Sequence, residues 1–347
     1  MNLSCGIIGK PFSGKSTLFA LMTGEDGGGK FGPVRGMAKV SDSRIDYLSS
    51  LYHPKKTTYA SVEFIDVPGV SGSETGENKM LEHVRNTESL LAVIGAFEEE
   101  DCDASLQGEI QGILDELLLN DLILTENRLE KIKHQRNPQE KDEFVLFSRL
   151  HEALEENRPL RSLDLKEDEQ KAIKGFQFFT LKPLMFVINI HEEAIPRAEA
   201  IENRLREKLA NDAHTGVIAL SALIEEEIMQ LPEEERPAFL EEMGIGEPAT
   251  EKVIRSIYSL LGLISFFTAG EDEVKAWTIR KGASARSAAG EIHSDIERGF
   301  IKAELVHYDD FAATPDMKKL KEAGLVRLEG KEYVVRDGDI INFKFNV

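Results

Sequence analysis

Short apolar runs alternate with glycine-rich turns and amphipathic stretches over the first hundred or so residues of the chain. Cys5–Ile8, Ser61–Val67 and Leu90–Ala96 have the length and composition of buried strands. Leu184–Ile190 and Val217–Leu220 repeat this pattern later, and helical sequence follows each of them. Strands that alternate with helices are typical of a parallel sheet covered by helices. The pattern therefore predicts an α/β domain.

A helical period interrupts this pattern between about residues 104 and 176. Mostly apolar residues recur here at alternating steps of four and three positions, which places them in a single seam on one face of a helix. They are Leu118, Leu122, Thr125, Leu129 and Ile132. Asn137-Pro138 breaks the period, and Phe147, Leu150 and Leu154 resume a similar spacing. We expect two antiparallel helices inserted into the α/β domain. A solvated helical hairpin and an arm that docks a partner fit this pattern about equally well.

The chain changes character again from about Leu263, where short apolar runs and glycine turns replace long helical patterns. Tyr333-Val334-Val335 and Ile340–Val347 flank the turn Asp337-Gly338-Asp339, which is a hairpin signal. We therefore expect a separate α+β domain at the C-terminus. The predicted limits are 1–103 and 177–262 for the two parts of the α/β domain, 104–176 for the helical insert and 263–347 for the C-terminal domain.

Composition narrows the classes of protein that fit these patterns. The chain has 347 residues, of which 41% are hydrophobic, and 62 acidic against 42 basic residues give a formal charge of −20. This balance argues against a broad, non-specific hold on nucleic acid or an anionic membrane, although it permits a local basic patch. The sequence has no apolar run near the roughly 20 residues that span a bilayer and no secretory leader, and its two cysteines, Cys5 and Cys102, form no disulfide framework. We expect a cytoplasmic protein without membrane association.

A glycine-rich segment directly follows the first predicted strand and precedes the helical stretch Thr17–Met22. It matches G-x-x-x-x-G-K-[ST] and reads Gly9-Lys10-Pro11-Phe12-Ser13-Gly14-Lys15-Ser16-Thr17. Glycines let the backbone curl so that its N–H groups point at phosphate oxygens, and the following helix adds its positive N-terminus. Lys15 would reach the β- and γ-phosphates, and the Ser16 hydroxyl would ligate Mg²⁺. The segment thus predicts a nucleotide site formed by Gly9, Phe12, Ser13, Gly14, Lys15, Ser16 and Thr17.

Asp66 ends the second predicted strand and forms the sequence D-x-x-G together with Gly69. Asp66 can hold a Mg²⁺-bound water, and the Gly69 N–H can sense the γ-phosphate. D-x-x-G alone is a common turn, but a position about fifty residues after a phosphate loop makes it more specific. Lys15, Asp66 and Gly69 are therefore the candidate catalytic residues, and Ser16 and Asp66 are the candidate metal ligands.

Loops at the carboxyl ends of later strands are expected to recognise the base. Asn189-Ile190-His191-Glu192 stands where a guanine-specific switch protein has N-K-x-D, whose aspartate accepts two guanine N–H groups. Glu192 moves that carboxylate by one methylene, and Ile190 offers an apolar surface to the base. Both changes weaken the guanine interpretation without establishing an adenine one. Ser221-Ala222-Leu223, after the Val217–Leu220 run, fits the loop on the other side of the base by its position.

These motifs, in the order G domain, helical insert, G domain, resemble the YchF (Obg-related) family of P-loop NTPases. The C-terminal segments that resemble the family's TGS module are Phe266-Phe267-Thr268-Ala269-Gly270, Ala276–Gly282, Ala288–Phe300, Glu329–Tyr333, Asp337-Gly338-Asp339 and Phe345-Asn346-Val347. The resemblance implies a Ras-like G domain with an inserted α-helical hairpin and a C-terminal α+β domain of the β-grasp, TGS-like type. It also implies Mg²⁺-dependent binding and slow hydrolysis of ATP, with GTP accepted to a variable degree, and association with the ribosome.

Several positions depart from the pattern of that family. Phe12-Ser13 stands where the family's phosphate loop usually has N-V, and Lys30 aligns with the threonine of T-I-E-P, a candidate Mg²⁺ ligand. The segment Asp101–Ser105 lacks a histidine that is proposed to position water in the family. Val70 agrees with the family, which carries an apolar residue where classical GTPases have a water-orienting glutamine, so intrinsic turnover should be slow.

Three functions stay open on these grounds: an ATP-preferring switch linked to the ribosome, a GTP-specific GTPase, and a nearly inactive nucleotide-sensing adaptor. The adaptor would present the helical hairpin and the TGS-like domain to a partner. Contact with the ribosome or another RNA, through the helical insert or the TGS-like domain, requires a local basic surface. Arg280-Lys281 with Arg286, and Lys131-Lys133-Arg136 at the hairpin tip, are candidates for such a surface.

Overall fold

The molecule is described from a computed structural model, which covers residues 3–26, 32–67, 80–97, 102–133, 138–209, 212 and 214–346. For 102–104 and 138–141 the description is limited to the backbone. Contacts divide the chain into two compact units. The larger unit consists of Ser4–Gly36 and Glu63–Val253, and the smaller unit mainly of Met37–Val62 and Ile254–Val347.

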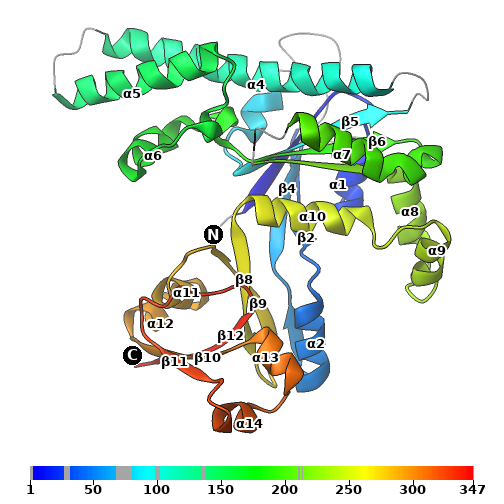
Figure 1. The fold of residues 1–347 in the computed structure, drawn as a ribbon, viewed down its shortest axis with the longest axis vertical. Helices are drawn as coiled ribbons and strands as arrows, with labels where there is room; N and C mark the ends of the chain where they lie inside the picture. The colour runs from blue at the N-terminus through cyan, green and yellow to red at the C-terminus, as the bar shows by residue number, and fades with distance from the viewer. Residues whose placement is uncertain are drawn as a thin grey trace. The chain divides into compact units, whose positions relative to one another are not determined.

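A six-stranded sheet in the order β2–β4–β1–β5–β6–β7 runs through the larger unit (Figure 1). Its strands are β1 (Ser4–Ile8), β2 (Val34–Lys39), β4 (Ser61–Asp66), β5 (Ser89–Ala96), β6 (Leu184–Ile190) and β7 (Thr215–Leu220). The pairings from β4 through β1, β5 and β6 to β7 are all parallel. The α/β class and the five strands predicted from apolar runs are therefore confirmed, because parallel strands covered on both faces are apolar throughout.

The edge strand β2 was not predicted. Its residues alternate between buried and exposed positions, with Arg35, Met37 and Lys39 facing solvent. Such alternation is typical of a strand with one buried face, but here it covers only six residues and includes Gly36. The pattern was therefore too short to separate from the glycine-rich stretch before it.

Helices connect the strands of this sheet, and the last three of them follow its final strand in the chain and lead into the smaller unit. They are α1 (Lys15–Thr23), α4 (Cys102–Ile132), α5 (Pro138–Glu155), α6 (Glu167–Ile173), α7 (Ala198–Lys208), α8 (Ala222–Gln230), α9 (Arg236–Glu242) and α10 (Ala249–Leu260), with short 3-10 turns η1 (Leu160–Ser162), η2 (Lys174–Phe176), η3 (Phe179–Leu181) and η4 (Glu192–Arg197). Among the described residues, these helices include none that is long and apolar enough to cross a membrane.

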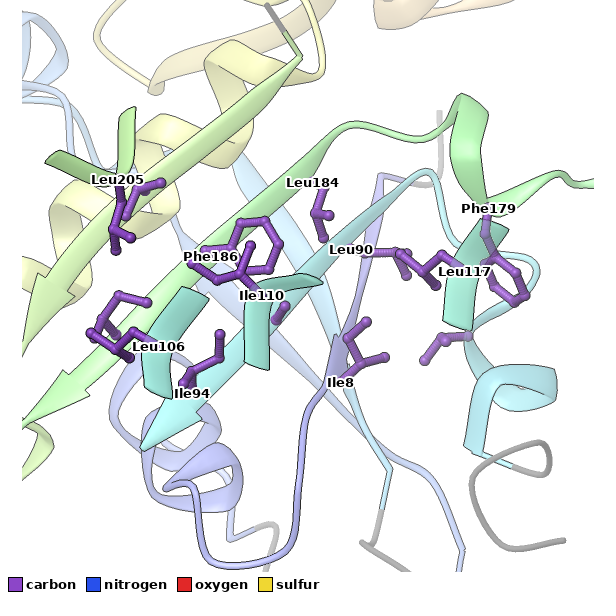
Figure 2. Packing of buried hydrophobic residues seen from close by; sticks show 14 of the residues in the cluster. Ile8, Leu90, Ile94, Leu106, Ile110, Leu117, Phe179, Leu184, Phe186 and Leu205 are labelled. Atoms are coloured by element: carbon purple, nitrogen blue, oxygen red, sulfur yellow. The ribbon is translucent and has the colours of Figure 1, made fainter. Parts of the chain in front are cut away.

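One face of the sheet is covered by α7 and by the first half of α4. Figure 2 shows Leu106, Ile110 and Leu117 of α4 near apolar side chains of the sheet such as Ile94 and Phe186. Burial of each such side chain stabilises the fold by roughly 1.5–3 kcal/mol. This packing fixes the start of α4 on the sheet.

The second half of α4 packs against α5. Thr125 is fully buried, and its hydroxyl lies 3.0 Å from Nδ1 of His151. Arg128 of α4 pairs with Glu143 of α5 at 2.7 Å. The remaining seam residues of α4 lie in one apolar cluster with Phe147, Leu150 and Leu154 of α5: Leu118, Leu122, Leu129 and Ile132. The seam read from the sequence thus faces the second helix.

The smaller unit has its own sheet in the order β11–β10–β12–β8–β9–β3. Its strands are β3 (Lys56–Thr58), β8 (Leu263–Ala269), β9 (Glu273–Arg280), β10 (Phe300–His307), β11 (Arg327–Glu329) and β12 (Asp339–Phe345), and its helices are α2 (Ser43–Tyr52), α11 (Ala285–Ile292), α12 (Ser294–Arg298), α13 (Tyr308–Ala313) and α14 (Met317–Glu322). β12 pairs parallel with β8 and antiparallel with β10. The C-terminal α+β domain with short helices is therefore confirmed.

Met37–Val62 belongs by its contacts to the smaller unit, although the predicted limits include it in the first part of the α/β domain. β3 of this segment pairs parallel with β9, and the Thr58 hydroxyl donates to Glu273 at 2.6 Å. α2 also packs against β8 and β9. The predicted domain limits did not anticipate this arrangement, because the contacts join residues more than two hundred positions apart.

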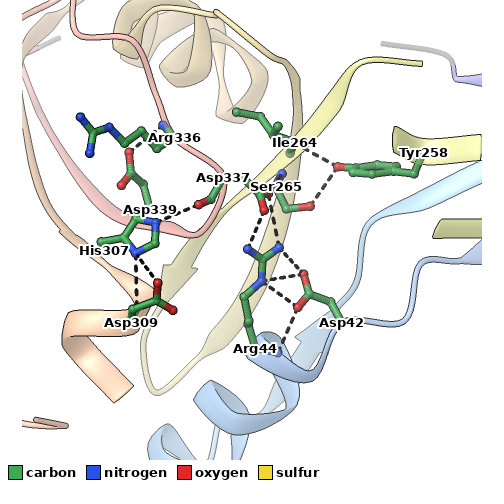
Figure 3. A network of polar contacts seen from close by, with 10 residues as sticks. All are labelled: Asp42, Arg44, Tyr258, Ile264, Ser265, His307, Asp309, Arg336, Asp337 and Asp339. Carbon is green, nitrogen blue, oxygen red and sulfur yellow. Dashed lines mark hydrogen bonds and ion pairs between the residues drawn. The ribbon is translucent and has the colours of Figure 1, made fainter. Parts of the chain in front are cut away.

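The predicted hairpin around Asp337 is wrong. β12 is flanked by β10 and β8, so Val334 makes only an isolated bridge with Ser284. The Asp337 carboxylate instead accepts the Ser265 N–H at 2.8 Å and pairs with Arg44 at 2.7 Å (Figure 3). These contacts hold the turn against β8 and α2, and both edges of β12 are already paired.

Candidate nucleotide site

Two glycines shape the loop between β1 and α1. Gly9 has a φ of 138°, and a Cβ there would lie 2.3 Å from the carbonyl oxygen of Val93. Gly14 has a φ of 95°, and a Cβ there would lie 2.3 Å from Nδ2 of Asn189. Side chains cannot be accommodated at such distances, so the first and sixth positions of the motif require glycine.

The loop leads into the N-terminus of α1, whose position is fixed by the buried side chains of Leu18 and Phe19. Gly14 precedes the helix and provides no side-chain cap, and the first turn carries no acidic residue. The first N–H groups of a helix lack partners within the helix and bear partial positive charge. Without a capping side chain they are available to an anion, so this end of α1 is suited to phosphate.

Lys15 directs its ammonium group back into the loop. Its Nζ donates to the carbonyl oxygen of Lys10 at 2.5 Å, and the side chain is only 5% exposed. Burial lowers the pKa of Lys15, and the nearby Asp66 carboxylate partly opposes this. The loop thus holds a cation that can exchange a carbonyl oxygen for a phosphate oxygen.

Ser16 and Asp66 come together from the start of α1 and the end of β4. The Ser16 hydroxyl donates to Oδ2 of Asp66 at 2.8 Å. Asp66 is 1% exposed, and burial raises its pKa while the Ser16 hydrogen bond and Lys15 act in the opposite direction. The predicted pair of metal ligands is therefore in contact across fifty residues of sequence.

Two buried oxygens of this site have no hydrogen-bond partner among the described residues: Oδ1 of Asp66 itself and the hydroxyl of Ser13 in the loop. A buried polar atom without a partner is costly, and native structures usually satisfy it with a ligand, an ion or water. Carboxylate and hydroxyl oxygens are the ligands that Mg²⁺ prefers. The chemistry of Ser16 and Asp66 therefore fits a magnesium ion bound next to phosphate.

Asn189 links the phosphate loop to a second loop. Its Nδ2 donates to the carbonyl oxygen of Ser13 at 3.1 Å, and its Oδ1 accepts the Ala222 N–H at 2.9 Å. The side chain is 5% exposed. The assignment of Asn189 to the base stays a prediction. Its contacts also suit it to position the two loops, which no local pattern indicated. Ser221, which precedes Ala222, is buried and begins α8.

Ile190 does not have the predicted position beside a base. It is 2% exposed and packs in the apolar core with residues of β5, α4 and α7. Successive side chains of a strand point to opposite faces, so Ile190 must point away once Asn189 faces the loop. The prediction of an apolar base surface at Ile190 is therefore wrong.

The other predicted residues lie at the surface around the loop. Glu192 is partly exposed at the start of η4, and Leu223 is 52% exposed at the start of α8. Thr17 is exposed on α1, and Phe12 is 96% exposed with a φ of 62°. Gly69, Val70 and Lys30 lie outside the described residues, and so do Asp101, Arg136, Asn137 and Val347 of the sequence analysis. The sequence did not predict one contact of the loop. Lys10 pairs with Glu109 of α4 at 3.0 Å.

We expect the variant Asn189→Ala to bind every phosphate ligand less tightly, by roughly tenfold. The change leaves the Ala222 N–H without its buried partner, a loss on the order of 1–3 kcal/mol, and frees the Ser13 carbonyl. Titration with inorganic tripolyphosphate measures the effect without a base. Asn127→Ala, on the exposed side of α4, is the control. Unchanged tripolyphosphate affinity beside reduced nucleotide affinity would assign Asn189 to the base instead.

Comparisons with known proteins find similarity along the whole chain. Residues 4–128 match a family model described as 50S ribosome-binding GTPase, and residues 263–346 match the model YchF-GTPase_C, described as a protein of unknown function. A Bacillus subtilis (strain 168) protein named Ribosome-binding ATPase YchF is 42% identical over 368 residues, which cover 100% of both chains. The chain belongs to the YchF family.

Other members of the YchF family give the same result. A protein of the same name from Escherichia coli O157:H7 is 37% identical over 365 residues, again 100% of both chains. The solved structure of the Schizosaccharomyces pombe YchF GTPase superposes with a TM-score of 0.87 at 29% identity, over 99% of this chain and 98% of that one. The recognition of the YchF family from sequence motifs is confirmed, and so is its P-loop G domain fold.

Proposed function

We propose that the protein is a P-loop nucleoside triphosphatase that binds Mg·ATP, hydrolyses it slowly and associates with the ribosome. The carrying observation is the contact of Ser16 with Asp66 beside two unpartnered buried oxygens, at the N-terminus of α1. Lys15 is buried in the same loop and would neutralise phosphate charge. The names of the relatives, Ribosome-binding ATPase YchF, support the nucleotide and the partner.

Ser16 and Asp66 would hold the magnesium ion, whose role in such sites is to neutralise charge on the β- and γ-phosphates. Ser16 would bind it through the hydroxyl, and Asp66 through its carboxylate or a bound water. Gly69 remains a proposed contact of the γ-phosphate. Val70 cannot hydrogen-bond a water, which supports slow turnover. The protein is proposed to act in the cytoplasm.

The base is proposed to lie between the loops that begin after β6 and β7. Asn189 joins these loops to Ser13, and they are flanked by the partly exposed Glu192 and the exposed Leu223. GTP is the second candidate, since a matched family model and the Schizosaccharomyces pombe protein are both described as GTPases. Both candidates use the same phosphate residues, so the difference lies in the base alone.

The remaining parts are proposed contacts of the ribosome or another RNA. In the smaller unit, β12 runs parallel to β8 with α11 following β9, which supports a β-grasp, TGS-like domain related to that of the Obg-type proteins. We propose that α4 and α5 form the inserted helical hairpin. Arg280, Lys281 and Arg286 are exposed in the smaller unit. Lys131 and Lys133 are exposed near the end of α4, in the larger unit.

We expect isothermal titration to give tighter binding of ADP than of GDP, with at least about a tenfold difference in Kd, which is 1.4 kcal/mol. Glu192 and Ile190 in place of the aspartate and lysine of N-K-x-D weaken the contacts that favour guanine, and adenine presents an acceptor at N1 where guanine has a donor. The reverse preference by a similar factor would identify a GTPase.

A phosphate-release assay with Mg²⁺ and ATP tests the enzyme itself. We expect slow release that stops when magnesium is chelated by EDTA, because Ser16 and Asp66 act through the ion. Release no faster than in buffer, together with ribosome binding that depends on nucleotide, would instead support the nearly inactive adaptor. Cosedimentation with purified ribosomes in ATP, ADP and no nucleotide measures that dependence.

A further inference from the structure

The side of α4 that faces away from α5 and from the sheet carries two large apolar residues. Leu119 is 54% exposed and Ile123 is 50% exposed. The two are four positions apart, so their side chains are neighbours on the helix surface. Their sequence neighbours Leu118 and Leu122 pack in the apolar cluster with α5. Within the described residues, Leu119 and Ile123 thus form an apolar surface that the chain itself leaves uncovered.

The same line of α4 contains two glycines toward its N-terminus. Gly108 and Gly112 are exposed, and a Cβ built at either one would have no atom within 4 Å. Glycine weakens a helix interior, and the described part of the chain gives no packing reason for it here. Because glycine has no side chain, the helix surface at Gly108 and Gly112 would let the backbone of another helix approach closely next to the apolar pair. We call Gly108, Gly112, Asp115, Leu119, Ile123 and Glu126 the outer stripe of α4; their spacing of four, three, four, four and three keeps them on one side.

The charge of this helix selects the occupant. The outer stripe contains Asp115 and Glu126 and no Lys or Arg, and the basic residues of α4, Arg128 and Lys131, lie nearer its C-terminal end. Asp115 and Glu126 are exposed at either side of the apolar pair. A nucleic acid backbone would be repelled, because it needs Lys and Arg to replace its counterions. A second copy of the chain would bring the same acidic residues against this surface, and like charges in juxtaposition disfavour such a pairing.

We propose that the outer stripe of α4 docks an amphipathic helix of a partner protein, with apolar residues against Leu119 and Ile123 and basic residues against Asp115 and Glu126. Helices are commonly recognised by apolar anchors at such spacing, while the surrounding charges set specificity and orientation. The partner helix continues over Gly108 and Gly112, where its backbone comes closest. No residue of the outer stripe belongs to the phosphate loop. The neighbouring Glu109 pairs with Lys10 of that loop, so the variants below change Leu119, Ile123 and Gly112 and leave Glu109 intact.

The probe is a fluorescein-labelled helical peptide of about 16 residues, with leucines at every third or fourth position and lysines beside them. A peptide with glutamate in place of lysine is its control, and a labelled single-stranded RNA of similar length tests the other class of partner. Fluorescence polarisation with the full chain gives the affinities. We expect the basic peptide to bind at least about tenfold more tightly than the acidic peptide, and the RNA to bind weakly.

The variant Leu119→Gln/Ile123→Gln should bind the basic peptide at least about tenfold less tightly. Val145→Gln on α5, where the residue is 67% exposed, should leave the affinity for the basic peptide unchanged. This variant controls for general attraction of a basic peptide to an acidic protein. Nucleotide binding should be the same in both variants, so a failure here is distinguishable from a failure of the proposed function. Equal peptide affinity in the two variants, or RNA binding that depends on Leu119, would overturn the proposal.

Gly112→Ala separates docking from folding. Alanine is a better helix former and meets no atom at this position, so the melting temperature should rise. If a partner helix lies over Gly112, the added methyl group should lower the affinity for the basic peptide several-fold, although the variant is more stable. A more stable variant with undiminished peptide affinity would refute the close approach of a helix.

Discussion

Lys15→Ala is expected to weaken ATP binding at least about a hundredfold, which corresponds to about 2.7 kcal/mol. Lys15 is 5% exposed, and its ammonium group lies against the loop that contains Gly9 and Gly14, near Asp66. Removing a buried cation from a phosphate contact leaves anionic charge uncompensated in a place with little water. Titration calorimetry with ATP and Mg²⁺ measures the loss, and phosphate release should fall with it.

The chain offers a matched control in the same loop. Lys10 is exposed and pairs with Glu109, and only its backbone carbonyl meets Lys15. Lys10→Ala should therefore change ATP affinity by less than about threefold, since exposed ion pairs contribute about 0–1 kcal/mol. Ser16→Ala should lose magnesium-dependent binding specifically. Equal ATP affinity in Lys15→Ala and the wild type would remove the basis for a phosphate site.

The second large effect concerns stability and the anchoring of α4. Asp121→Ala should lower the free energy of unfolding by about 3–5 kcal/mol, because three buried donors lose their acceptor. The Asp121 carboxylate is fully buried and accepts the Phe179 N–H at 2.9 Å. It also accepts the N–H and the hydroxyl of Thr180, both at 2.7 Å. Urea denaturation followed by circular dichroism measures the change.

Asp115→Ala is the control for Asp121, since Asp115 is exposed six positions earlier on the same helix. Its effect should lie within about 0.5 kcal/mol of zero. Amide hydrogen exchange gives a second readout, in which Phe179 and Thr180 should lose protection in Asp121→Ala. A stable Asp121→Ala variant with protected amides at both positions would mean that other contacts hold α4.

The outcome for the individual elements separates local from long-range information. The runs of β1, β5 and β6 and the seam of α4 could be read directly, because strand and helix periods are properties of neighbouring residues. The phosphate loop could be read for the same reason. β2 was missed because its alternation is brief, and the hairpin at Asp337 was wrong because β10 and β8 occupy both edges of β12.

The candidate site divides in the same way. The types and spacing of Lys15, Ser16 and Asp66 predicted a phosphate and magnesium site, and the Ser16–Asp66 contact agrees with it. The place of Asn189 could not be predicted, because it depends on Ser13 and Ala222, which are 176 and 33 positions away. The burial of Ile190 in the core follows from the orientation of Asn189, since adjacent residues of a strand face opposite sides.

By itself the sequence determined the chemistry of the phosphate loop, the apolar strands and the helical period of α4, together with membership of the YchF family. The loop, the strands and the helical period depend on residues a few positions apart, where glycine torsions and side-chain periods act directly on the backbone, whereas the family resemblance draws on motifs along the whole chain. Only the tertiary structure decided that Asn189 ties two loops together, that Asp121 anchors α4, and that Met37–Val62 joins the C-terminal sheet. These contacts connect distant segments, and their partners are selected by burial and hydrogen bonding once the chain is packed, which no local pattern records.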